Sequence, residues 1–471
     1  MTTLLTLITI ALYLGLLFMV AWRSSRKADC ENFFSGRHAP GWVIALAMVG
    51  APMTGVTFIS VPGSVELSSF SYLQMVLGFI VGSVAIAYLL IPIYYKHNVT
   101  SLYEYLDSRF GVCSHRSGAW LFLASKLLGT ALKTFVACLV VQQLLCAPLG
   151  VPFTVTVAVF ILLVWLYTYR GGVGSVVWID AVKTICMAVC VVFAIYFVLQ
   201  SLELSICEAS SKACNKGLTK LLFVEDWNDS RHFVKMFFAG LFMIVAMTGL
   251  DQDMMQRALS SHSQCSAQRN IILASLLQAI IITLLLTLGA LLYLYLTEEG
   301  LSVAKADEAF AYVATRQCMP AIISVLLVLG VMAATFSSTA GALTSLTTSF
   351  AVDIAQRKGL NHKWIHATMA AVIALLVLAF EWWSNESTIN LVYQVASYTY
   401  GPLLGLFAFG IFSKRRVRDK FVPLVVIAAP IICLVLDFNS KMWFAGYEFG
   451  FEILLLNAAI TSAGLHCISR K

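Results

Sequence analysis

The sequence predicts an all-α, polytopic membrane protein, and three observations carry this prediction. First, 60% of the 471 residues are hydrophobic and only 12% are charged, whereas about a quarter of the residues in a typical soluble domain are charged. Second, many apolar runs reach the roughly 20 residues that an α-helix needs to cross a bilayer. Third, these runs follow one another along the whole chain, so we expect a single membrane domain over residues 1–471.

We expect about thirteen membrane-spanning helices. They cover residues 3–22, 41–65, 70–94, 114–143, 150–168, 176–200, 232–252, 270–297, 319–349, 364–384, 387–413, 420–437 and 449–467. The first span is about 20 residues long and lacks a basic N-terminal region, which argues against a cleaved signal peptide. It is an extra helix before two five-span units, and the two helices over 420–467 follow them.

Lys and Arg in the loops set the expected orientation, because cytoplasmic loops are enriched in both. Most of these residues fall in loops that follow odd-numbered spans, such as the run Lys414–Lys420, and fewer fall in the other loops, such as Lys212 and Lys216. We therefore expect the N-terminus outside and the C-terminus inside. The loop that holds Cys207 and Cys214 then lies outside, where a disulfide between them is permitted.

Two of the expected helices are interrupted near their middle. The second span reads Val49-Gly50-Ala51-Pro52-Met53-Thr54, and its proline frees backbone carbonyls in the preceding turn. The seventh span carries Met247-Thr248-Gly249-Leu250. Each interruption alone also fits a simple packing kink. Together they open two units of five spans, over 41–200 and 232–413, and units with an odd number of spans have opposite topology. Paired interruptions in two such halves indicate a transporter binding site.

The ninth span ends in a segment that is dense in hydroxyls and small residues, Thr335-Phe336-Ser337-Ser338-Thr339-Ala340-Gly341-Ala342. Small residues let helices approach closely in lipid, and hydroxyls bond across helices or to their own turn, which suffices to explain any single Ser or Thr here. The functional interpretation is that Ser337 and Ser338, with the carbonyl of Ala334, offer oxygen to a small hard cation, because hard cations take oxygen ligands.

Motifs spread over residues 31–416 resemble the sodium:solute symporter family. In chain order they are Glu31-Asn32-Phe33-Phe34-Ser35-Gly36-Arg37, Ser101-Leu102-Tyr103-Glu104-Tyr105-Leu106-Asp107-Ser108-Arg109-Phe110-Gly111, Val177-Trp178-Ile179-Asp180, Gly249-Leu250-Asp251-Gln252 with Gln256-Arg257, and Gly401-Pro402-Leu403-Leu404-Gly405-Leu406-Phe407. Each motif is weak alone, but their order and spacing are specific together. The resemblance implies a fold of the LeuT type, with two inverted five-helix repeats.

The resemblance also implies a sodium site between the second and ninth spans. Carried over position by position, its ligands fall on the backbone carbonyls of Gly50, Met53 and Ala334 and on the hydroxyls of Ser337 and Ser338. Carbonyl ligands do not depend on the side chain, so all five positions have compatible chemistry. The co-transported ion is therefore expected to be Na⁺.

Two departures from the family pattern predict that a second sodium site, known in some members, is absent. That site uses serines one turn beyond Ser338, where this chain has Ala340 and Gly341. Asp180, which would serve that site, remains, but Lys183 stands where many members have Gln. Because a spacing of three places both residues on one helix face, we expect an Asp180–Lys183 ion pair with a coupling or gating role, unless one or both are solvated at the helix end.

Several positions bear on the solute. Ile244, Met247 and Pro52 replace polar residues of the sugar-transporting members, which disfavours a sugar, although Gln394 aligns with a substrate-contacting Gln of that branch. The segment with Thr54 and Thr57 is closer to the iodide, monocarboxylate and vitamin branch, and Thr248 lies at the second interruption. The expected solute contacts are Thr54, Thr57, Lys133, Thr248 and Gln394.

Lys126 and Lys133 are two lysines within the fourth span. Lysines inside a membrane span are costly and are functional candidates by default. Lys126 also fits a side chain that reaches the membrane interface, and Lys133 also fits a structural partner such as a carbonyl or Asp180. Lys133 nevertheless favours a small organic anion as the solute.

We therefore expect a sodium-coupled symporter in the plasma membrane, or in the inner membrane of a bacterium, that imports a small solute by alternating access. The alternative is a transporter-like sensor or channel without coupled uptake. An intramembrane enzyme is disfavoured, because no catalytic motif such as HExxH, GxSxG or a P-loop is present. The expected partners are the solute and the lipid bilayer, with no nucleic acid despite the net charge of +7 and no obligate protein partner.

Overall fold

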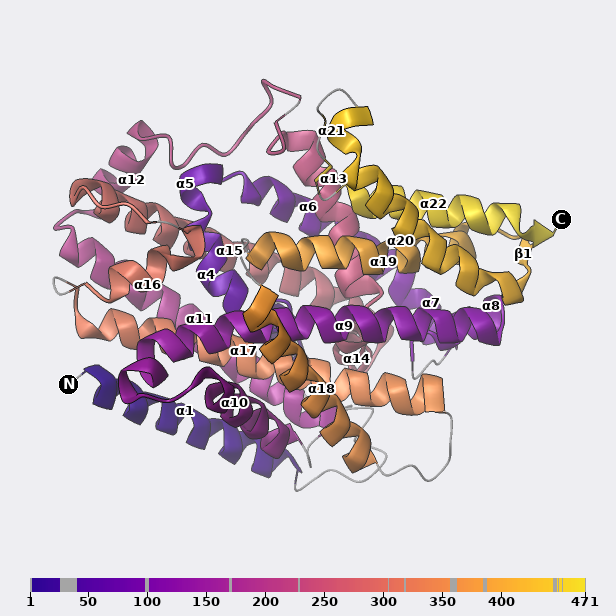
Figure 1. Cartoon of the computed structure of the whole chain (residues 1–471), viewed down its shortest axis with the longest axis horizontal. Helices are drawn as coiled ribbons and strands as arrows, with labels where there is room; N and C mark the ends of the chain where they lie inside the picture. Colours follow the sequence, from indigo (N-terminus) through magenta and orange to yellow (C-terminus); the bar gives the residue numbers. More distant parts are fainter. Residues whose placement is uncertain are drawn as a thin grey trace.

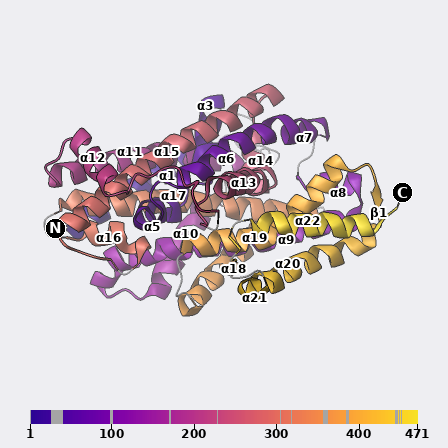
Figure 2. The ribbon, with the colours of Figure 1, turned by 90° about the horizontal axis from the view of Figure 1, so that it is seen from above.

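The computed structural model of the chain is mostly helical. It describes residues 2–25, 40–97, 101–168, 172–227, 229–303, 305–316, 319–355, 362–383, 388–443, 447, 449–450 and 452–470, so the motif over 31–37 lies outside the described residues. Most helices run along the long axis of the molecule, and the two ends of the chain lie at opposite ends of that axis (Figures 1 and 2).

The described part of the first half of the chain consists of long helices and several short helical segments. Its elements are α1 (Thr2–Ser25), α3 (Gly41–Gly50), α4 (Gly55–Gly63), α5 (Val65–Ser68), α6 (Tyr72–Ala85), η1 (Ile86–Leu90), α7 (Ile91–His97), α8 (Glu104–Arg109), α9 (Val112–Val141), η2 (Gln142–Cys146), η3 (Ala147–Leu149), α10 (Phe153–Thr168), α11 (Gly172–Ser201) and α12 (Ile206–Asn215).

The described part of the second half is also helical, and it contains one pair of short strands. Its elements are α13 (Phe233–Ile244), η4 (Val245–Gly249), α14 (Gln252–Leu259), α15 (Gln264–Glu298), η5 (Ala306–Glu308), α16 (Ala309–Ala314), α17 (Ala321–Ser349), η6 (Phe350–Ala355), α18 (His362–Trp383), α19 (Thr388–Phe412), β1 (Arg416–Val417), η7 (Asp419–Phe421), α20 (Val422–Phe438), α21 (Ser440–Trp443), α22 (Ile453–Cys467) and β2 (Ser469–Arg470). The strands β1 and β2 pair antiparallel, with Arg416 opposite Arg470.

Within the described residues, eight helices are long and apolar enough to cross a bilayer, and up to ten spans result if each of two bent helix pairs counts as one. Three shorter apolar helices cover Ile8–Val20, Phe153–Thr168 and Ile453–Cys467. Each range expected from the sequence overlaps one of these helices or bent pairs. The prediction of a polytopic helical membrane protein is thus confirmed at this level.

The second expected span is broken where its proline predicts. α3 ends at Gly50, α4 begins at Gly55, and the two helices meet at 56°. Thr54 caps α4 in a capping box with Thr57, whose Oγ1 accepts the backbone N–H of Thr54 at 3.4 Å. A proline cannot continue the hydrogen-bond ladder, so the cap starts a new helix in a new direction.

The seventh expected span is also broken at the predicted place. After the π-helical turn η4, α14 starts at Gln252, and the bend is 70°. The carboxylate of Asp251 caps α14, accepting the backbone N–H groups of Asp253 at 2.9 Å and Met254 at 3.3 Å. An acidic N-cap suits a helix start because it satisfies unpaired amides and favours the positive end of the helix dipole.

Tyrosines from the first half satisfy the carbonyls that the second break frees. Tyr94 Oη donates to the carbonyl of Gly249 at 2.9 Å, and Tyr103 Oη donates to that of Leu250 at 3.1 Å. Both tyrosines are buried. Because no water is available in the hydrocarbon region to replace such bonds, these two contacts fix the break in place.

Glycines let α6 and α13 touch backbone to backbone. A Cβ added at Gly78 would collide with the carbonyl of Phe237 and lie 2.7 Å from the amide nitrogen of Leu241. A Cβ added at Gly240 would collide in the same way with the carbonyl of Met75. Small residues at such contacts are the usual means of close helix packing in lipid, so α13, which leads into the second break, is held tightly against α6.

The disulfide allowed by the sequence is not formed. Cys207 and Cys214 are both free, and both lie on α12. Cys214 follows Cys207 by seven positions, which is about two helical turns or about 10 Å at a rise of ~1.5 Å per residue. A disulfide needs Cα atoms closer than about 7 Å. The loop prediction was wrong because this segment has a capping box, Ser205 with Glu208, that starts a helix.

The contact between α6 and α13 can be tested with Gly78→Ala. The added methyl group meets main-chain atoms that cannot rotate away, so we expect a loss of about 1–3 kcal/mol in stability, the range typical of overpacking. Gly15→Ala is the matched control, because no atom lies within 4 Å of its added Cβ. Thermal unfolding of the purified protein in detergent measures both, and equal melting temperatures for the two variants would contradict the packing.

Candidate functional site

A cavity of about 120 Å³ lies where the two breaks meet. Its volume compares with that of an engineered cavity of about 150 Å³ that holds benzene, so it fits a small solute. Its lining includes Ala51, Pro52, Thr54 and Thr57 from the first break, Lys126 and Lys133 from α9, Thr248 and Asp251 from the second break, Ser338 from α17 and Tyr400 from α19. An apolar wall with a few convergent polar groups is typical of small-molecule sites.

Four of the five expected solute contacts meet in this cavity. They are Thr54, Thr57, Lys133 and Thr248. Gln394 is not among the lining residues and is exposed, whereas its neighbours Val395 and Ala396 do line the cavity. Successive residues of a helix lie about 100° apart around its axis, so a shift of one position is enough to put Gln394 on another face of α19.

The two lysines of α9 have different surroundings. Lys126 Nζ lies 3.0 Å from Asp251 Oδ2 and 2.9 Å from Asp253 Oδ2, so its charge is balanced. Lys133 is half-buried and lines the cavity, and within the described residues the structure records no hydrogen bond or ion pair for it. Among the described residues, neither a carbonyl nor Asp180 bonds to Lys133, so its ammonium faces the cavity without an acid within hydrogen-bonding distance.

The five expected sodium ligands come from two segments that pack together. Gly50 and Met53 flank the first break, and Ala334, Ser337 and Ser338 lie on α17. A Cβ added at Gly55 would collide with Thr335 Oγ1, so the start of α4 rests directly on α17. Except for Ser338, which is partly buried and lines the cavity, the expected ligands are buried.

The hydroxyls of the expected sodium site are free to take a ligand. Ser337 Oγ is buried and has no hydrogen-bond partner in the part of the chain that the structure describes. Ser338 Oγ donates to the carbonyl of Thr335 on its own helix at 3.1 Å, which leaves its lone pairs available. A buried hydroxyl without a partner costs free energy, and a bound cation would offset this cost. The residues present therefore fit Na⁺ as the transported ion.

Lys183 reaches the same region from α11. Its side chain is fully buried, and Nζ donates to the carbonyl of Gly50 at 2.5 Å. The end of α3 is pressed against α11, because a Cβ added at Gly50 would lie 2.9 Å from the carbonyl of Asp180. One of the carbonyls expected to bind sodium thus already accepts a hydrogen bond from a cationic side chain.

The expected ion pair between Asp180 and Lys183 is not formed in this structure. Asp180 Oδ2 instead accepts a hydrogen bond from Arg257 Nε of α14 at 2.7 Å, and both side chains are buried. Arg257 pairs with Asp180 in place of Lys183 because the helix that carries Arg257 packs on α11. Its guanidinium presents several donors in one plane. Asp180 Oδ1 remains without a partner among the described residues.

Arg257 also stands at the position considered for a second sodium site. A Cβ added at Gly341 would collide with Arg257 Nη2 and would lie 2.8 Å from Asp253 Oδ1. A serine at this position would therefore meet the guanidinium before it could bind an ion. The space beside Gly341 is filled by a cation of the protein itself, which gives a physical reason for the small residue there.

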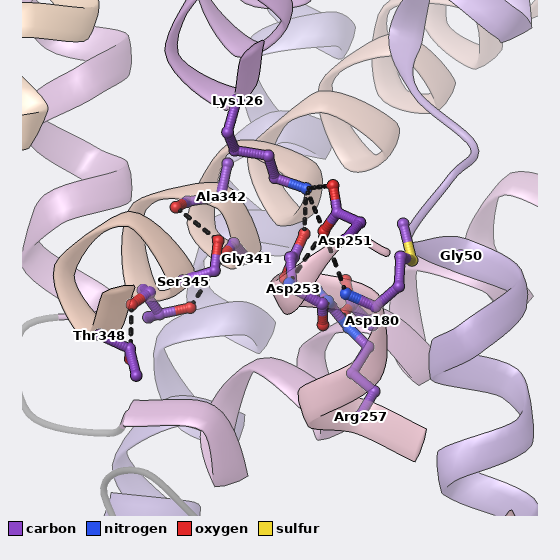
Figure 3. A network of polar contacts seen from close by, with 12 residues as sticks. Gly50, Lys126, Asp180, Asp251, Asp253, Arg257, Gly341, Ala342, Ser345 and Thr348 are labelled. Atoms are coloured by element: carbon purple, nitrogen blue, oxygen red, sulfur yellow. Dashed lines mark hydrogen bonds and ion pairs between the residues drawn. The ribbon is translucent and has the colours of Figure 1, made fainter. Parts of the chain in front are cut away.

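Sequence reasoning missed the charge network around α14 as a unit. Arg257 pairs with Asp180 and Asp253, and Lys126 pairs with Asp251 and Asp253, so side chains of three helices join in one buried cluster (Figure 3). Tyr400 of α19 adds a hydrogen bond to Asp251 Oδ2 at 2.5 Å. A signal was available in the sequence, because charged residues within membrane spans commonly pair with one another. Asp180 lies in the expected sixth span, Asp251 lies at the end of the expected seventh, and Asp253 follows it directly.

Comparison with known proteins gives the family of the chain's relatives. The sequence model described as the sodium:solute symporter family matches residues 32–419. The chain is 26% identical to the sodium/sialic acid symporter of Aliivibrio fischeri over 431 residues, which cover 86% of this chain and 82% of the relative. It is also 26% identical to the sodium/sialic acid symporter of Proteus mirabilis over 462 residues, which cover 92% of this chain and 90% of the relative.

A solved structure has a similar fold over its whole length. It is the substrate-bound, outward-open state of a Na⁺-coupled sialic acid symporter, and it superposes with a TM-score of 0.84. The match covers 100% of this chain and 99% of that chain at 20% sequence identity. At this identity the likeness shows the fold alone.

The charge network can be tested with Lys126→Met, which keeps the bulk of the side chain. Asp251 would lose its ion-pair partner and Asp253 would keep only Arg257, and removing one partner of a buried ion pair costs about 3–5 kcal/mol. We therefore expect a clear loss of thermal stability in detergent. Lys216→Met, at an exposed position, is the control. The network would be refuted if Lys126→Met unfolded at the same temperature as the control.

Proposed function

Because this chain belongs to the sodium:solute symporter family, we propose that the solute it imports together with sodium is a small organic anion. As a member of the family it is a sodium-coupled symporter that works by alternating access. The anion proposal rests on one observation, the unpaired ammonium of Lys133 at the wall of the cavity. A cation there lowers the cost of bringing a negative charge to mid-membrane, where charge is poorly solvated.

The size and lining of the cavity further favour a compact anion. A cavity of about 120 Å³ suits a short carboxylate in this conformation, and hydroxyls of Thr54, Thr57 and Thr248 are available to accept or donate hydrogen bonds. The half-helix that starts after Thr54 adds partial positive charge at its N-terminus. Sialic acid, named for two relatives, is itself a carboxylic acid and belongs in the panel of solutes to be tested.

For the ion, the proposed ligands are the carbonyls of Gly50, Met53 and Ala334 and the hydroxyls of Ser337 and Ser338. The partnerless Ser337 hydroxyl and the packing of α4 on α17 support this assignment. Asp180, Lys183 and Arg257 are the proposed coupling residues, because they join α11, α14 and the end of α3 beside that site. Sodium would favour binding of an anion electrostatically, and this coupling is reciprocal.

We propose the LeuT-type arrangement of the chain in full. Residues 41–200 form the first inverted repeat and 232–413 the second, each opened by a bent pair, with an extra helix over 3–22 and two helices over 420–467. Counting the three shorter apolar helices gives thirteen spans, with the N-terminus outside and the C-terminus inside. An odd number of spans puts the two chain ends on opposite sides of the membrane, which agrees with their opposite positions in the molecule (Figure 1). Which end is outside rests on the Lys and Arg residues of the loops, and the plasma membrane, or a bacterial inner membrane, is the proposed location.

The sodium site can be tested with the double variant Ser337→Ala/Ser338→Ala. It removes two oxygen ligands and leaves side chains that still pack, so we expect transport to become nearly insensitive to sodium. Ser345→Ala is the matched control, because that serine lies on the same helix and bonds only to the carbonyl of Ala342 among the described contacts. Uptake into proteoliposomes as a function of sodium concentration is the measurement. Normal sodium activation in a well-folded double variant would rule out this site.

We predict one sodium ion per transport cycle. Arg257 fills the space beside Gly341, where the second sodium site of some family members would lie, so we expect that site to bind no ion. The Hill coefficient for sodium activation of uptake should then be about 1, because a single site cannot bind ions cooperatively. A coefficient clearly above this value, or a measured stoichiometry of two ions per solute, would speak against the prediction.

The anion proposal can be tested with Lys133→Met. Removing the charge should raise the half-saturating solute concentration about tenfold or more, as for the loss of one charge-assisted hydrogen bond, and change the sodium dependence little. The screen should include short monocarboxylates, sialic acid, iodide and neutral glucose, with binding measured as a thermal shift and transport measured as uptake. Unchanged solute affinity together with lower folded yield would show that Lys133 is structural, and transport of only neutral solutes would end the proposal.

A further inference from the structure

Two cations are candidates to bind the carbonyl oxygen of Gly50. It is one of the proposed sodium ligands, and in the structure it accepts a hydrogen bond from Lys183 Nζ at 2.5 Å. Lys183 is completely buried, so this contact is not an incidental surface bond. A carbonyl lone pair can face either an ammonium or a metal ion, and two cations that share one carbonyl repel each other strongly where little water screens them.

The ammonium of Lys183 is held incompletely. An ammonium carries three N–H donors, and the structure records one acceptor for it within the described residues, the Gly50 carbonyl. Leaving donors of a buried charge unmatched is costly. Such a group is therefore held more weakly than a fully bonded one, and a competitor for its single acceptor can displace it.

A second acceptor for Lys183 is ready on its own helix. Asp180 Oδ1 is buried and has no partner among the described residues, while Oδ2 stays bonded to Arg257. Asp180 and Lys183 are three residues apart on α11, a spacing that places them on one face within reach of each other. The side chain of Lys183 can exchange Gly50 for Asp180 by rotation about its own bonds, without movement of the helix.

We propose that Lys183 is a tethered cation that competes with sodium for the Gly50 carbonyl, and that sodium binding transfers its ammonium to Asp180. The proposal rests on the sodium site proposed above. Without sodium, Lys183 cross-links the end of α3 to α11 and supplies positive charge to the oxygens of the site. With sodium bound, the Asp180–Lys183 pair forms and that cross-link is released.

This exchange links the ion to the conformation of the broken helix. Sodium then does more than add a charge, because it also removes a hydrogen bond that restrains the first break. A ligand shifts a conformational equilibrium only through different interactions with the two states, and the Gly50 carbonyl provides such a difference. Lys183 also sets the sodium affinity, since each ion must displace the ammonium before it binds.

The test measures sodium binding to the purified full-length protein, with no solute added. Sodium chloride is titrated against choline chloride at constant ionic strength, and the apparent affinity is obtained from the thermal shift and from calorimetry. We expect Lys183→Met and Lys183→Gln to bind sodium about tenfold more tightly than the unmodified protein, the effect of removing one charge-assisted hydrogen bond that competes with the ion. Lys216→Met, at an exposed position, should bind sodium as the unmodified protein does.

A second readout follows the break itself. In choline, amide hydrogen exchange in residues 50–55 should be faster in Lys183→Met than in the unmodified protein, because the cross-link to α11 is missing. Sodium should remove most of this difference. A purely structural lysine would give faster exchange in both salts.

The outcomes separate this proposal from the site on which it rests. Unchanged or weaker sodium binding in folded Lys183→Met or Lys183→Gln would contradict the proposal that Lys183 competes with sodium. If Ser337→Ala/Ser338→Ala abolishes sodium binding in the same assay, the sodium site stands even though the competition by Lys183 is rejected. If the double serine variant binds sodium normally, the site itself is wrong and the tethered cation falls with it.

Discussion

The structure depends on one constraint: backbone groups at membrane depth must find partners inside the protein. Two helices are interrupted, at Gly50–Gly55 and at Gly249–Gln252, and side chains of the surrounding segments bond to backbone carbonyls at these breaks. Tyr94 and Tyr103 donate to the carbonyls of the second break, and Lys183 donates to a carbonyl of the first. Irregular backbone survives in lipid only when it is buried in this way or lines a cavity.

The side chains that bond to the backbone carbonyls differ between the two breaks, and this difference bears on function. Neutral phenols complete the second break, and they come from the segment around α7 and α8. A charged amine completes part of the first break, and it meets the break on the side where the sodium ligands are proposed. A phenol is a permanent partner for a carbonyl, whereas an ammonium can be replaced by another cation. The first break is therefore the one suited to respond to an ion.

Charge balance ties these features together. Asp180, Asp251 and Asp253 are buried, and Arg257 and Lys126 neutralise them in one network (Figure 3). Burying this many charges is acceptable only when each has a partner. Lys133 and Lys183 have no acidic partner within hydrogen-bonding distance among the described residues. These two lysines therefore do not belong to the ion-pair network: Lys133 lines the cavity and Lys183 lies at the proposed ion site.

Much of this architecture could be predicted from the sequence because strong local rules dictate it. Pro52 predicts the first break and the apolar runs predict the helices. The absence of a second ion site, expected from Ala340 and Gly341 by comparison with the family pattern, stays a prediction. The partners of the buried charges were harder to predict, because they depend on which helices become neighbours. Asp180 and Lys183 satisfy the i,i+3 rule, yet Arg257, 77 residues away along the chain, takes the carboxylate.

Local context also decided the smaller differences. Gln394 was expected to contact the solute because it aligns with a substrate-contacting Gln of the sugar-transporting branch, and one step of helical rotation is enough to take it out of the cavity lining. The segment with Cys207 and Cys214 reads as a polar loop by composition, but the capping box of Ser205 and Glu208 starts a helix that holds the two thiols apart. In both cases the sequence contains the residues but not the geometry that orients them.

The proposed function depends most on sodium binding between the first break and α17. A pair of experimental structures of the purified protein, one in saturating sodium chloride and one in choline chloride, tests this binding directly. We expect ion density in sodium alone, within coordination distance of the carbonyls of Gly50, Met53 and Ala334 and the hydroxyls of Ser337 and Ser338. Density for the ion elsewhere, or none between these oxygens in a preparation whose uptake is driven by sodium, would contradict it.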